Sequence, residues 1–267
     1  MKIDRRILYI IGAALVFITM LYPLGLPISI SDLTQQTYDA VENLPDGSLV
    51  IISPMYDPGA SGELNPMFTA FMYHCAERGY KIVVVNCNWT LGPQLVHPIV
   101  TDIMTQYGYQ YGTDYIELGS KPGGSIWMQS AVQDMIEACL TDYNNQPLAQ
   151  FPIMQLVPKL TKEYVAATLV LDCGTPGAPT WLTYVNQPTG IPLIVGEIQM
   201  SVPENMPYVD SGQYKGMIAG SRGCAEYELL IGHPGKAVKS QDTMSAIALM
   251  VTLFIILGNI GYLARKK

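Results

Sequence analysis

Apolar residues gather in two long runs at the ends of the chain and in six shorter runs between them. The first long run extends from Ile7 to Ile28, and the second from Asp242 to Leu263. Each run has roughly the 20 residues that an α-helix needs to cross about 30 Å of hydrocarbon. The pattern therefore predicts a transmembrane helix at each end and a domain between them that is held by two stems.

Each long run also fits a second interpretation. A cleaved signal peptide is the alternative for the first run, because that run is N-terminal and follows Arg5 and Arg6. Against this, the run is longer than a typical signal-peptide core, and residues 22–27 contain no clear small-x-small cleavage site. A buried core helix is the alternative for the second run, and the short basic tail at 264–267 favours a span instead.

The six shorter runs fit buried strands because they contain few polar residues and alternate with helical patterns. We therefore predict an α/β domain with a mostly parallel open sheet of about six strands and helices on both faces, plus two transmembrane helices. The strands are expected at 48–53, 81–85, 114–118, 167–173, 191–198 and 214–220, and the main helices at 33–44, 63–78, 92–107, 125–140, 179–185 and 221–231.

The distribution of charge predicts an orientation. Six of the 15 Lys and Arg residues lie in the tails at 1–6 and 264–267. The positive-inside rule then places both tails in the cytoplasm and the domain on the extracytoplasmic side of the cell membrane. The resulting organisation is a cytoplasmic tail at 1–6, a transmembrane helix at 7–28, an extracytoplasmic α/β domain at 29–238, a transmembrane helix at 242–263 and a cytoplasmic tail at 264–267.

The domain itself is acidic. Between residues 30 and 240 there are 20 acidic and nine basic residues, a net charge of −11. Such a surface repels nucleic acid, which we exclude as an expected partner. The expected partners are the lipid bilayer and either other membrane proteins or further copies of this chain.

Five scattered cysteines give no metal-binding pattern. They contain no CxxC pair, and none is near a histidine at metal-ligand spacing. One or two disulfides, or small buried side chains, are both compatible with their spacing. These cysteines are Cys75, Cys87, Cys139, Cys173 and Cys224.

Candidate ligand-binding residues lie where predicted strands end, because open parallel sheets bind ligands beyond the carboxyl ends of their strands. After the first strand come Asp57, Ser61 and Glu63, in a glycine-containing loop that either holds a polar ligand or simply caps the next helix. After the third strand come Lys121 and Gly123. A lysine between glycines could face a carboxylate or phosphate, or it could lie in a solvated loop.

Two later loops complete the candidate set. Asp172 ends an otherwise apolar strand, where a carboxylate either contacts a ligand or caps the next helix. Gly220, Gly223 and Glu226 lie where the last strand meets a helix. The glycines permit close approach of a ligand to the backbone, or close packing of the helix on the sheet. The helix N-terminus tolerates a carboxylate at Glu226.

No catalytic, metal-binding or cofactor motif accompanies these loops. The three histidines have no nucleophile or carboxylate partner at a recognisable spacing, and GxSxG, HExxH and Walker patterns are absent. Two functions follow as hypotheses. One is a non-enzymatic ligand-sensing or scaffolding component of a membrane assembly. The other is a membrane-tethered hydrolase or transferase that uses carboxylates at the strand ends.

Four segments carry a resemblance to a known group of proteins. They are residues 44–48 (LPDGS), 111–123 (YGTDYIELGSKPG), 220–228 (GSRGCAEYE) and 257–259 (LGN). The chain resembles a family of uncharacterised prokaryotic membrane proteins that have a stem at each end. The resemblance covers most of the chain and implies the same architecture. It implies no activity and no catalytic residue.

Overall fold

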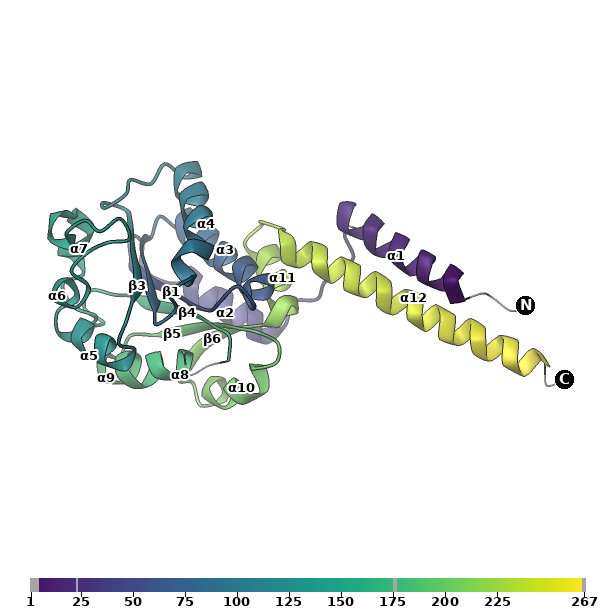
Figure 1. Ribbon diagram of the computed structural model, residues 1–267. Helices are drawn as coiled ribbons and strands as arrows, with labels where there is room; N and C mark the ends of the chain where they lie inside the picture. The colour runs from purple at the N-terminus through teal and green to yellow at the C-terminus, as the bar shows by residue number, and fades with distance from the viewer. Residues whose placement is uncertain (1–4, 23, 175–176, 266–267) are drawn as a thin grey trace.

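Six parallel strands form one sheet in the order β3-β2-β1-β4-β5-β6 (Figure 1). The computed structural model describes residues 5–22, 24–174 and 177–265. The order is that of a Rossmann fold, in which the chain starts at the centre, builds outward and then returns to build the other half. The strands are β1 Leu49–Met55, β2 Lys81–Cys87, β3 Tyr115–Lys121, β4 Ala167–Asp172, β5 Leu193–Glu197 and β6 Tyr214–Ala219.

Continuous apolar sequence explains why these segments are central strands. Every residue of β1, β4 and β5 is buried, as expected where helices cover both faces of a sheet. All five strand pairings are parallel. The predicted α/β class, the six strands and their parallel arrangement are confirmed.

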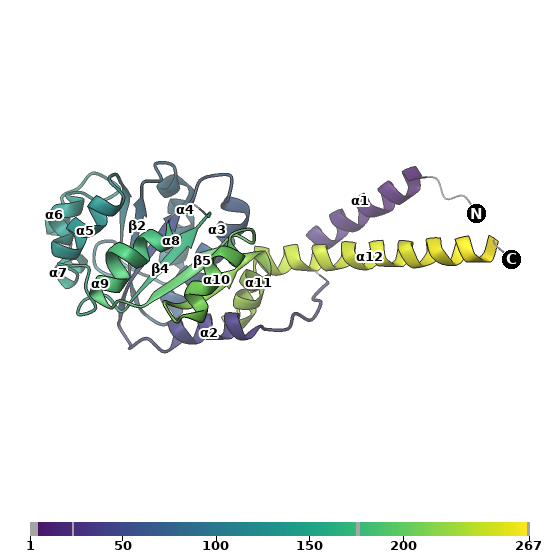
Figure 2. The ribbon, with the colours of Figure 1, turned by 90° about the horizontal axis from the view of Figure 1, so that it is seen from below.

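Two helical layers cover the sheet (Figures 1 and 2). One apolar core lies under α2, α3, α4 and α11, and the other under α5 to α10. The helices of the first layer are α2 Asp32–Glu42, α3 Ser61–Glu77, α4 Gly92–Gln106 and α11 Gly220–Leu230. Those of the second are α5 Ser125–Gln133, α6 Met135–Cys139, α7 Pro152–Leu156, α8 Ala178–Trp181, α9 Gln187–Thr189 and α10 Val202–Asp210, with a 3-10 turn η1 Leu148–Gln150 and a π-helical turn η2 Leu182–Asn186.

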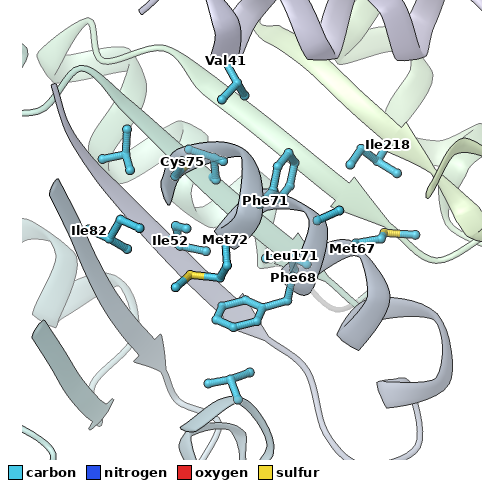
Figure 3. Packing of buried hydrophobic residues seen from close by; sticks show 14 of the residues in the cluster. Val41, Ile52, Met67, Phe68, Phe71, Met72, Cys75, Ile82, Leu171 and Ile218 are labelled. Carbon is cyan, nitrogen blue, oxygen red and sulfur yellow. The ribbon is translucent and has the colours of Figure 1, made fainter. Parts of the chain in front are cut away.

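Helix α3 supplies much of the first core. Phe68, Phe71 and Met72 are fully buried against strand residues such as Ile52 and Leu171 (Figure 3). Burying a side chain of this size contributes about 1.5–3 kcal/mol relative to leaving it exposed. This packing holds the carboxyl ends of β1 and β4 in a fixed relation.

The structure differs from the predicted helices at two places. The helix expected at 125–140 is broken at Asp134, which has an extended backbone (φ −152°) and accepts a hydrogen bond from Glu137 N as the N-cap of α6. The region of α10 was not predicted to be helical. The first of its prolines, at 203, lies at the start of the helix, where its missing N–H costs nothing.

The two ends of the described chain form a pair of helices that projects from the α/β body (Figures 1 and 2). Helix α1 spans Arg5–Leu21 and packs against α12, which spans Lys236–Arg265. Among the residues that the structure describes, only the stretch Lys236–Ile260 is long and apolar enough to cross a membrane, whereas Leu8–Leu21 is a shorter apolar helix. One of the two predicted spans is therefore matched in length, and the first segment forms a shorter helix than expected.

No disulfide joins any of the five cysteines, all of which lie in the described part of the chain. Cys75, Cys87, Cys139 and Cys224 are buried. Burial raises the pKa of the Cys75 thiol to about 12, so this thiol stays protonated at neutral pH. The alternative in which the cysteines act as small core residues describes these four.

Candidate functional site

A crevice opens at the carboxyl ends of β1 and β4, the point where the sheet order reverses. It has a volume of about 490 Å³, which lies in the range of small-molecule sites. This is where the fold predicts a ligand site. Its walls come from loops after four neighbouring strands: Met55, Asn88, Trp89, Gly124, Ser125, Met128, Gly177, Thr180 and Tyr184.

Unusual backbone geometry shapes one wall of the crevice. Gly123 and Gly124 both have positive φ (103° and 51°) immediately before α5, and Asn88 has φ 66° after β2. A Cβ atom at Gly124 would lie 2.6 Å from Nδ2 of Asn88. Glycine is therefore required at 124 to let the two loops meet.

Two buried carboxyl groups lie side by side at the carboxyl ends of β4 and β5, and that of Asp172 is next to the crevice residue Gly177. Asp172 and Glu197 occupy paired positions on the adjacent strands β4 and β5, about 4.8 Å apart in backbone. Oδ2 of Asp172 accepts hydrogen bonds from the backbone N–H groups of Gly177 (3.1 Å) and Ala178 (2.8 Å). Its Oδ1 atom and both carboxyl oxygens of Glu197 are buried without a hydrogen-bond partner.

Burial changes the protonation of this pair. Desolvation raises the pKa of Asp172 to about 6, against the opposing effect of its backbone N–H donors. Desolvation, and then repulsion from Asp172, raise the pKa of Glu197 to about 9. At neutral pH the pair therefore carries one negative charge, on Asp172, and one proton, on Glu197.

In the loop after β1, the side chains of Asp57 and Ser61 make hydrogen bonds to the backbone of the loop itself. Oδ1 of Asp57 accepts from Gly59 N at 2.9 Å, and Oγ of Ser61 donates to the carbonyl of Pro58 at 2.7 Å. Glu63 instead reaches the loop after β5, where its Oε2 accepts from Gln199 N at 3.1 Å. These residues shape the carboxyl edge of the sheet but do not line the crevice.

The two candidate residues at the end of β3, Lys121 and Gly123, lie in different surroundings. Lys121 is buried, and its Nζ donates to the carbonyls of Cys139 (2.9 Å) and Thr141 (2.7 Å). Gly123 borders a second, wider groove of about 690 Å³ on the other side of α5. The ammonium group of Lys121 thus stabilises the end of α6 and does not face the crevice.

Glu226 of α11 contacts the start of α2. Its carboxylate accepts hydrogen bonds from Ser31 N (2.9 Å), Ser31 Oγ (2.6 Å) and Thr34 Oγ1 (2.8 Å). Burial acts to raise the pKa of Glu226, but these bonds outweigh it and hold the pKa below its ordinary value. Gly220 has φ 62°, and a Cβ there would lie 2.3 Å from Oε1 of Gln199. A Cβ atom at Gly223 would make only ordinary van der Waals contacts with β6. The candidates of this loop therefore connect elements of the fold.

Two further carboxylates act at the base of the projecting helices. Glu228 accepts from the backbone N–H groups at the start of α12, those of Gly235 (2.8 Å), Ala237 (3.1 Å) and Val238 (2.9 Å). Asp242, one turn further along, accepts from Gly25 N (2.9 Å) and Leu26 N (3.0 Å). Together with Glu226, they attach both helices to the α/β body.

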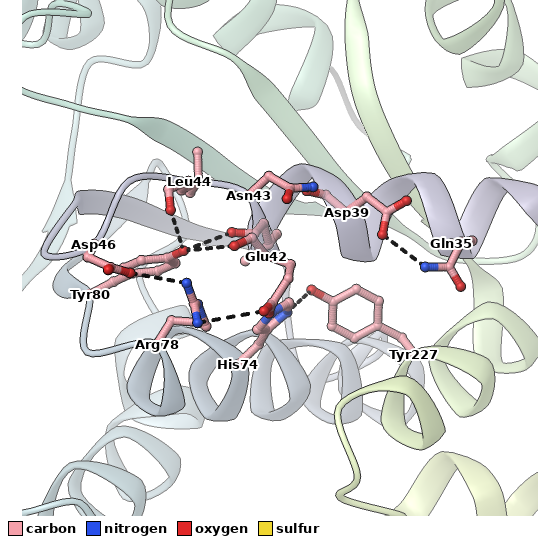
Figure 4. A network of polar contacts seen from close by, with 11 residues as sticks. Gln35, Asp39, Glu42, Asn43, Leu44, Asp46, His74, Arg78, Tyr80 and Tyr227 are labelled. Atoms are coloured by element: carbon pink, nitrogen blue, oxygen red, sulfur yellow. Dashed lines mark hydrogen bonds and ion pairs between the residues drawn. The ribbon is translucent and has the colours of Figure 1, made fainter.

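A buried polar network joins the same layer (Figure 4). His74 of α3 lies between Glu42 of α2 (Nε2 to Oε2, 2.9 Å) and Tyr227 of α11 (Nδ1 to hydroxyl, 2.6 Å). Arg78 adds contacts to Glu42 (3.7 Å) and to Asp46 (3.1 Å). The network fixes the positions of α2 and α11, the two elements next to the projecting pair.

Sequence reasoning missed Glu197 and most of the crevice walls. The signal for Glu197 was present, because it ends an apolar strand just as Asp172 does. The wall residues Trp89 and Tyr184 carry no comparable signal. They belong to segments that follow β2 and β4, and these segments are close together only because of the strand order.

Among the described residues, no group of three or more His, Cys, Asp and Glu side chains is arranged to hold a metal ion. No protein-family model matches the chain, and a comparison with curated proteins finds no match. The resemblance to two-stemmed prokaryotic membrane proteins therefore stays a prediction.

Proposed function

We propose that this protein is a membrane-anchored ligand-sensing or scaffolding domain, with the α/β body on the extracytoplasmic side and α1 and α12 in the bilayer. The observation that carries the proposal is the attachment of both helices through buried carboxylates. Glu228 holds the start of α12, and Asp242 holds the segment that follows α1. A change in the body would therefore be transmitted to both helices.

The surface of the helix pair supports the anchor. Large apolar side chains are exposed along α12 from Met244 to Tyr262, about 28 Å of helix at 1.5 Å per residue. Exposed apolar residues also cover α1, among them Tyr9, Phe17 and Ile18. In water such a surface would be unfavourable, whereas in a bilayer it matches the hydrocarbon thickness. A partner membrane protein or a second copy of the chain would also bind this surface.

The crevice supports the sensing part of the proposal. It lies at the position where Rossmann folds bind ligands, and its walls come from the loops after β1 to β4. Glu63, next to the β1 loop, contacts the loop after β5, and that loop contacts Gly220 at the start of α11. A ligand would thus act on the helix that leads into α12.

Protease accessibility tests the orientation. Protease added to intact spheroplasts that make the full chain should cut between residues 30 and 240 and leave fragments in the membrane fraction. Protection of this region until the membrane is lysed would contradict the orientation. Recovery of the whole chain in the soluble fraction after a carbonate wash would contradict the anchor itself.

An enzyme that uses carboxyl groups is the second candidate, and the Asp172–Glu197 pair favours it. Their pKa values of about 6 and about 9 are separated in the way that distinguishes a base from an acid in hydrolases. A hydrolysis or group-transfer activity that is lost in Glu197→Gln, with unchanged unfolding, would support this candidate. Activity that persists in both Asp172→Asn and Glu197→Gln would exclude a role for the pair.

A further inference from the structure

We propose that the crevice binds a small organic cation, a protonated amine or quaternary ammonium on an apolar body, and that the nearby Asp172–Glu197 pair balances the charge. The inference rests on the proposed function, in which the crevice is the ligand site of the anchored domain. It adds the chemical class of the ligand.

The walls of the crevice suit a cation with an apolar body. Trp89 and Tyr184 present aromatic rings, and Met55 and Met128 present polarisable thioethers. Aromatic rings attract ammonium groups through their negative faces, by about 0.5–2 kcal/mol. No Lys, Arg or His is among the described residues that line the crevice, so an anion would find no charged partner there.

Negative charge lies next to the wall of the crevice. A Cβ atom at Gly177 would lie 2.8 Å from Oδ1 of Asp172 and 2.9 Å from Oδ2. Gly177 lines the crevice and donates its backbone N–H to Oδ2 of Asp172, so this carboxylate lies next to a residue of the crevice wall. Oδ1 of the ionised Asp172 has no hydrogen-bond partner, and a buried charge requires compensation. A cation in the crevice would provide this compensation.

Within the described part of the chain, the groups that act on the pKa values of the pair do not supply a positive charge. Glu204 of α10 and the hydroxyl of Tyr214 of β6 face the pair, and Glu204 adds to the repulsion that keeps the proton on Glu197. Lys121, the cation predicted at this edge, is held by the carbonyls of Cys139 and Thr141. The domain as a whole, with 20 acidic and nine basic residues, also attracts cations.

Proton linkage gives the inference a distinctive signature. In the free protein near pH 7, Glu197 keeps its proton and Asp172 is ionised. A bound cation favours ionisation of Glu197, whose proton then passes to the buffer. Binding should therefore release part of one proton and become tighter as the pH rises from about 7 to about 9.

The test is calorimetric titration of the full chain in detergent with probes of matched shape. Phenethylammonium is the aromatic cation, with 2-phenylethanol as its neutral counterpart and 3-phenylpropionate as the anion, and choline is a second, quaternary cation. Phenethylammonium should bind at least about ten-fold more tightly than the neutral and anionic probes. Titration in two buffers of different ionisation enthalpy should reveal the released proton.

Three variants assign the effect to the pair. Asp172→Asn should weaken binding of phenethylammonium by about ten-fold or more. Glu197→Gln should abolish proton release and the pH dependence while the protein stays folded. Asp102→Asn, which neutralises an exposed carboxylate on α4, is the matched control and should change neither.

Equal or tighter binding of the neutral or anionic probe would overturn the inference, as would binding of neither cation. Proton release that persists in Glu197→Gln would also overturn it. None of these results depends on membrane orientation. A failure of the anchor would instead be seen in the protease and fractionation experiments.

Discussion

The ring nitrogen Nδ1 of His74 lies 2.6 Å from the hydroxyl oxygen of Tyr227, and both side chains are buried. A neutral imidazole satisfies its neighbours, with Nε2–H donating to Glu42 and Nδ1 accepting from the Tyr227 hydroxyl. An imidazolium would carry a proton on Nδ1 as well, and would force the hydroxyl proton of Tyr227 to turn away. The neutral form is therefore the one that joins α2, α3 and α11.

This contact predicts that the domain loses stability in mild acid. Burial lowers the pKa of His74 in spite of Glu42, and the hydrogen bond from His74 lowers the pKa of Glu42. At these two groups the unfolded chain thus binds protons more readily than the folded one, and their contribution to the free energy of unfolding should fall as the pH drops below about 6.5. Urea unfolding at stepped pH measures this. His74→Gln should flatten the decline, and an equal decline in that variant would contradict the assignment.

Removing the hydroxyl of Tyr227 should be costly. Tyr227→Phe leaves Nδ1 of His74 buried without a donor, which costs about 1–3 kcal/mol of unfolding free energy. Tyr208→Phe is the control, because the Tyr208 hydroxyl makes no hydrogen bond with the described residues, and it should change stability by less than about 0.5 kcal/mol. Similar stability of the two variants would show that the His74–Tyr227 bond contributes nothing.

The cap of α12 predicts a local effect. Glu228→Ala leaves the N–H groups of Gly235, Ala237 and Val238 without their acceptor, so the first turn of α12 should fray. Hydrogen exchange in residues 235–238 should accelerate by about ten-fold or more. The exposed carboxylate Glu163 provides the control, and Glu163→Ala should leave this exchange unchanged. Unaltered exchange in Glu228→Ala would mean that water replaces the cap at no cost.

The protonated state of Glu197 predicts that this residue costs stability at high pH. The folded pKa of about 9 lies above the ordinary value near 4.3, so the folded state holds a proton that the unfolded chain releases. The contribution of Glu197 to the free energy of unfolding should therefore fall as the pH rises from about 4.5 to about 9. Glu197→Gln should be more stable than wild type by on the order of 2–4 kcal/mol near pH 8, and about equal near pH 4.5. A constant difference across this range would show that Glu197 does not titrate differently in the two states.

The contact between β6 and α2 predicts that a single methyl group is destabilising. A Cβ at Gly216 would lie 2.6 Å from Cα of Thr37 and 2.8 Å from its Oγ1. Since the nearest atom is backbone, α2 has to move, and Gly216→Ala should cost about 1–3 kcal/mol. Gly62→Ala in α3 is the control, because the added Cβ meets nothing within 4 Å, and it should be neutral or stabilising by about 0.5–1 kcal/mol. Thermal unfolding of both variants makes the comparison.

The strands were predictable from sequence because most of them are nearly continuous apolar runs and each is followed by a helical pattern. Their order was not, because it depends on pairings such as Val50 with Ala167, which are over 100 residues apart. The crevice could not be predicted from the sequence for the same reason. Met55, Trp89 and Tyr184 meet only because β1 lies between β2 and β4.

Among the polar residues chosen at strand ends, some lie near the crevice and others do not. Asp172 was chosen because it ends an apolar strand, and it does lie next to the crevice residue Gly177. Lys121 was chosen for the same kind of position, but its long side chain reaches the carbonyls of α6, whose early start at Met135 depends on the cap at Asp134. Position along a strand locates the Cα atom, whereas the direction of a long side chain depends on neighbours that sequence does not reveal.

The hydrogen bonds of Asp242 to Gly25 and Leu26 join residues that are 217 and 216 positions apart. At synthesis rates of about 5–20 residues per second, the carboxylate that holds the first helix is made roughly 10–40 s after that helix. During this interval α1 has neither its packing partner nor its tether. In the proposed membrane-anchored form, α1 would therefore have to meet lipid before α12 is made, and the contacts between the two helices would form only at the end of synthesis.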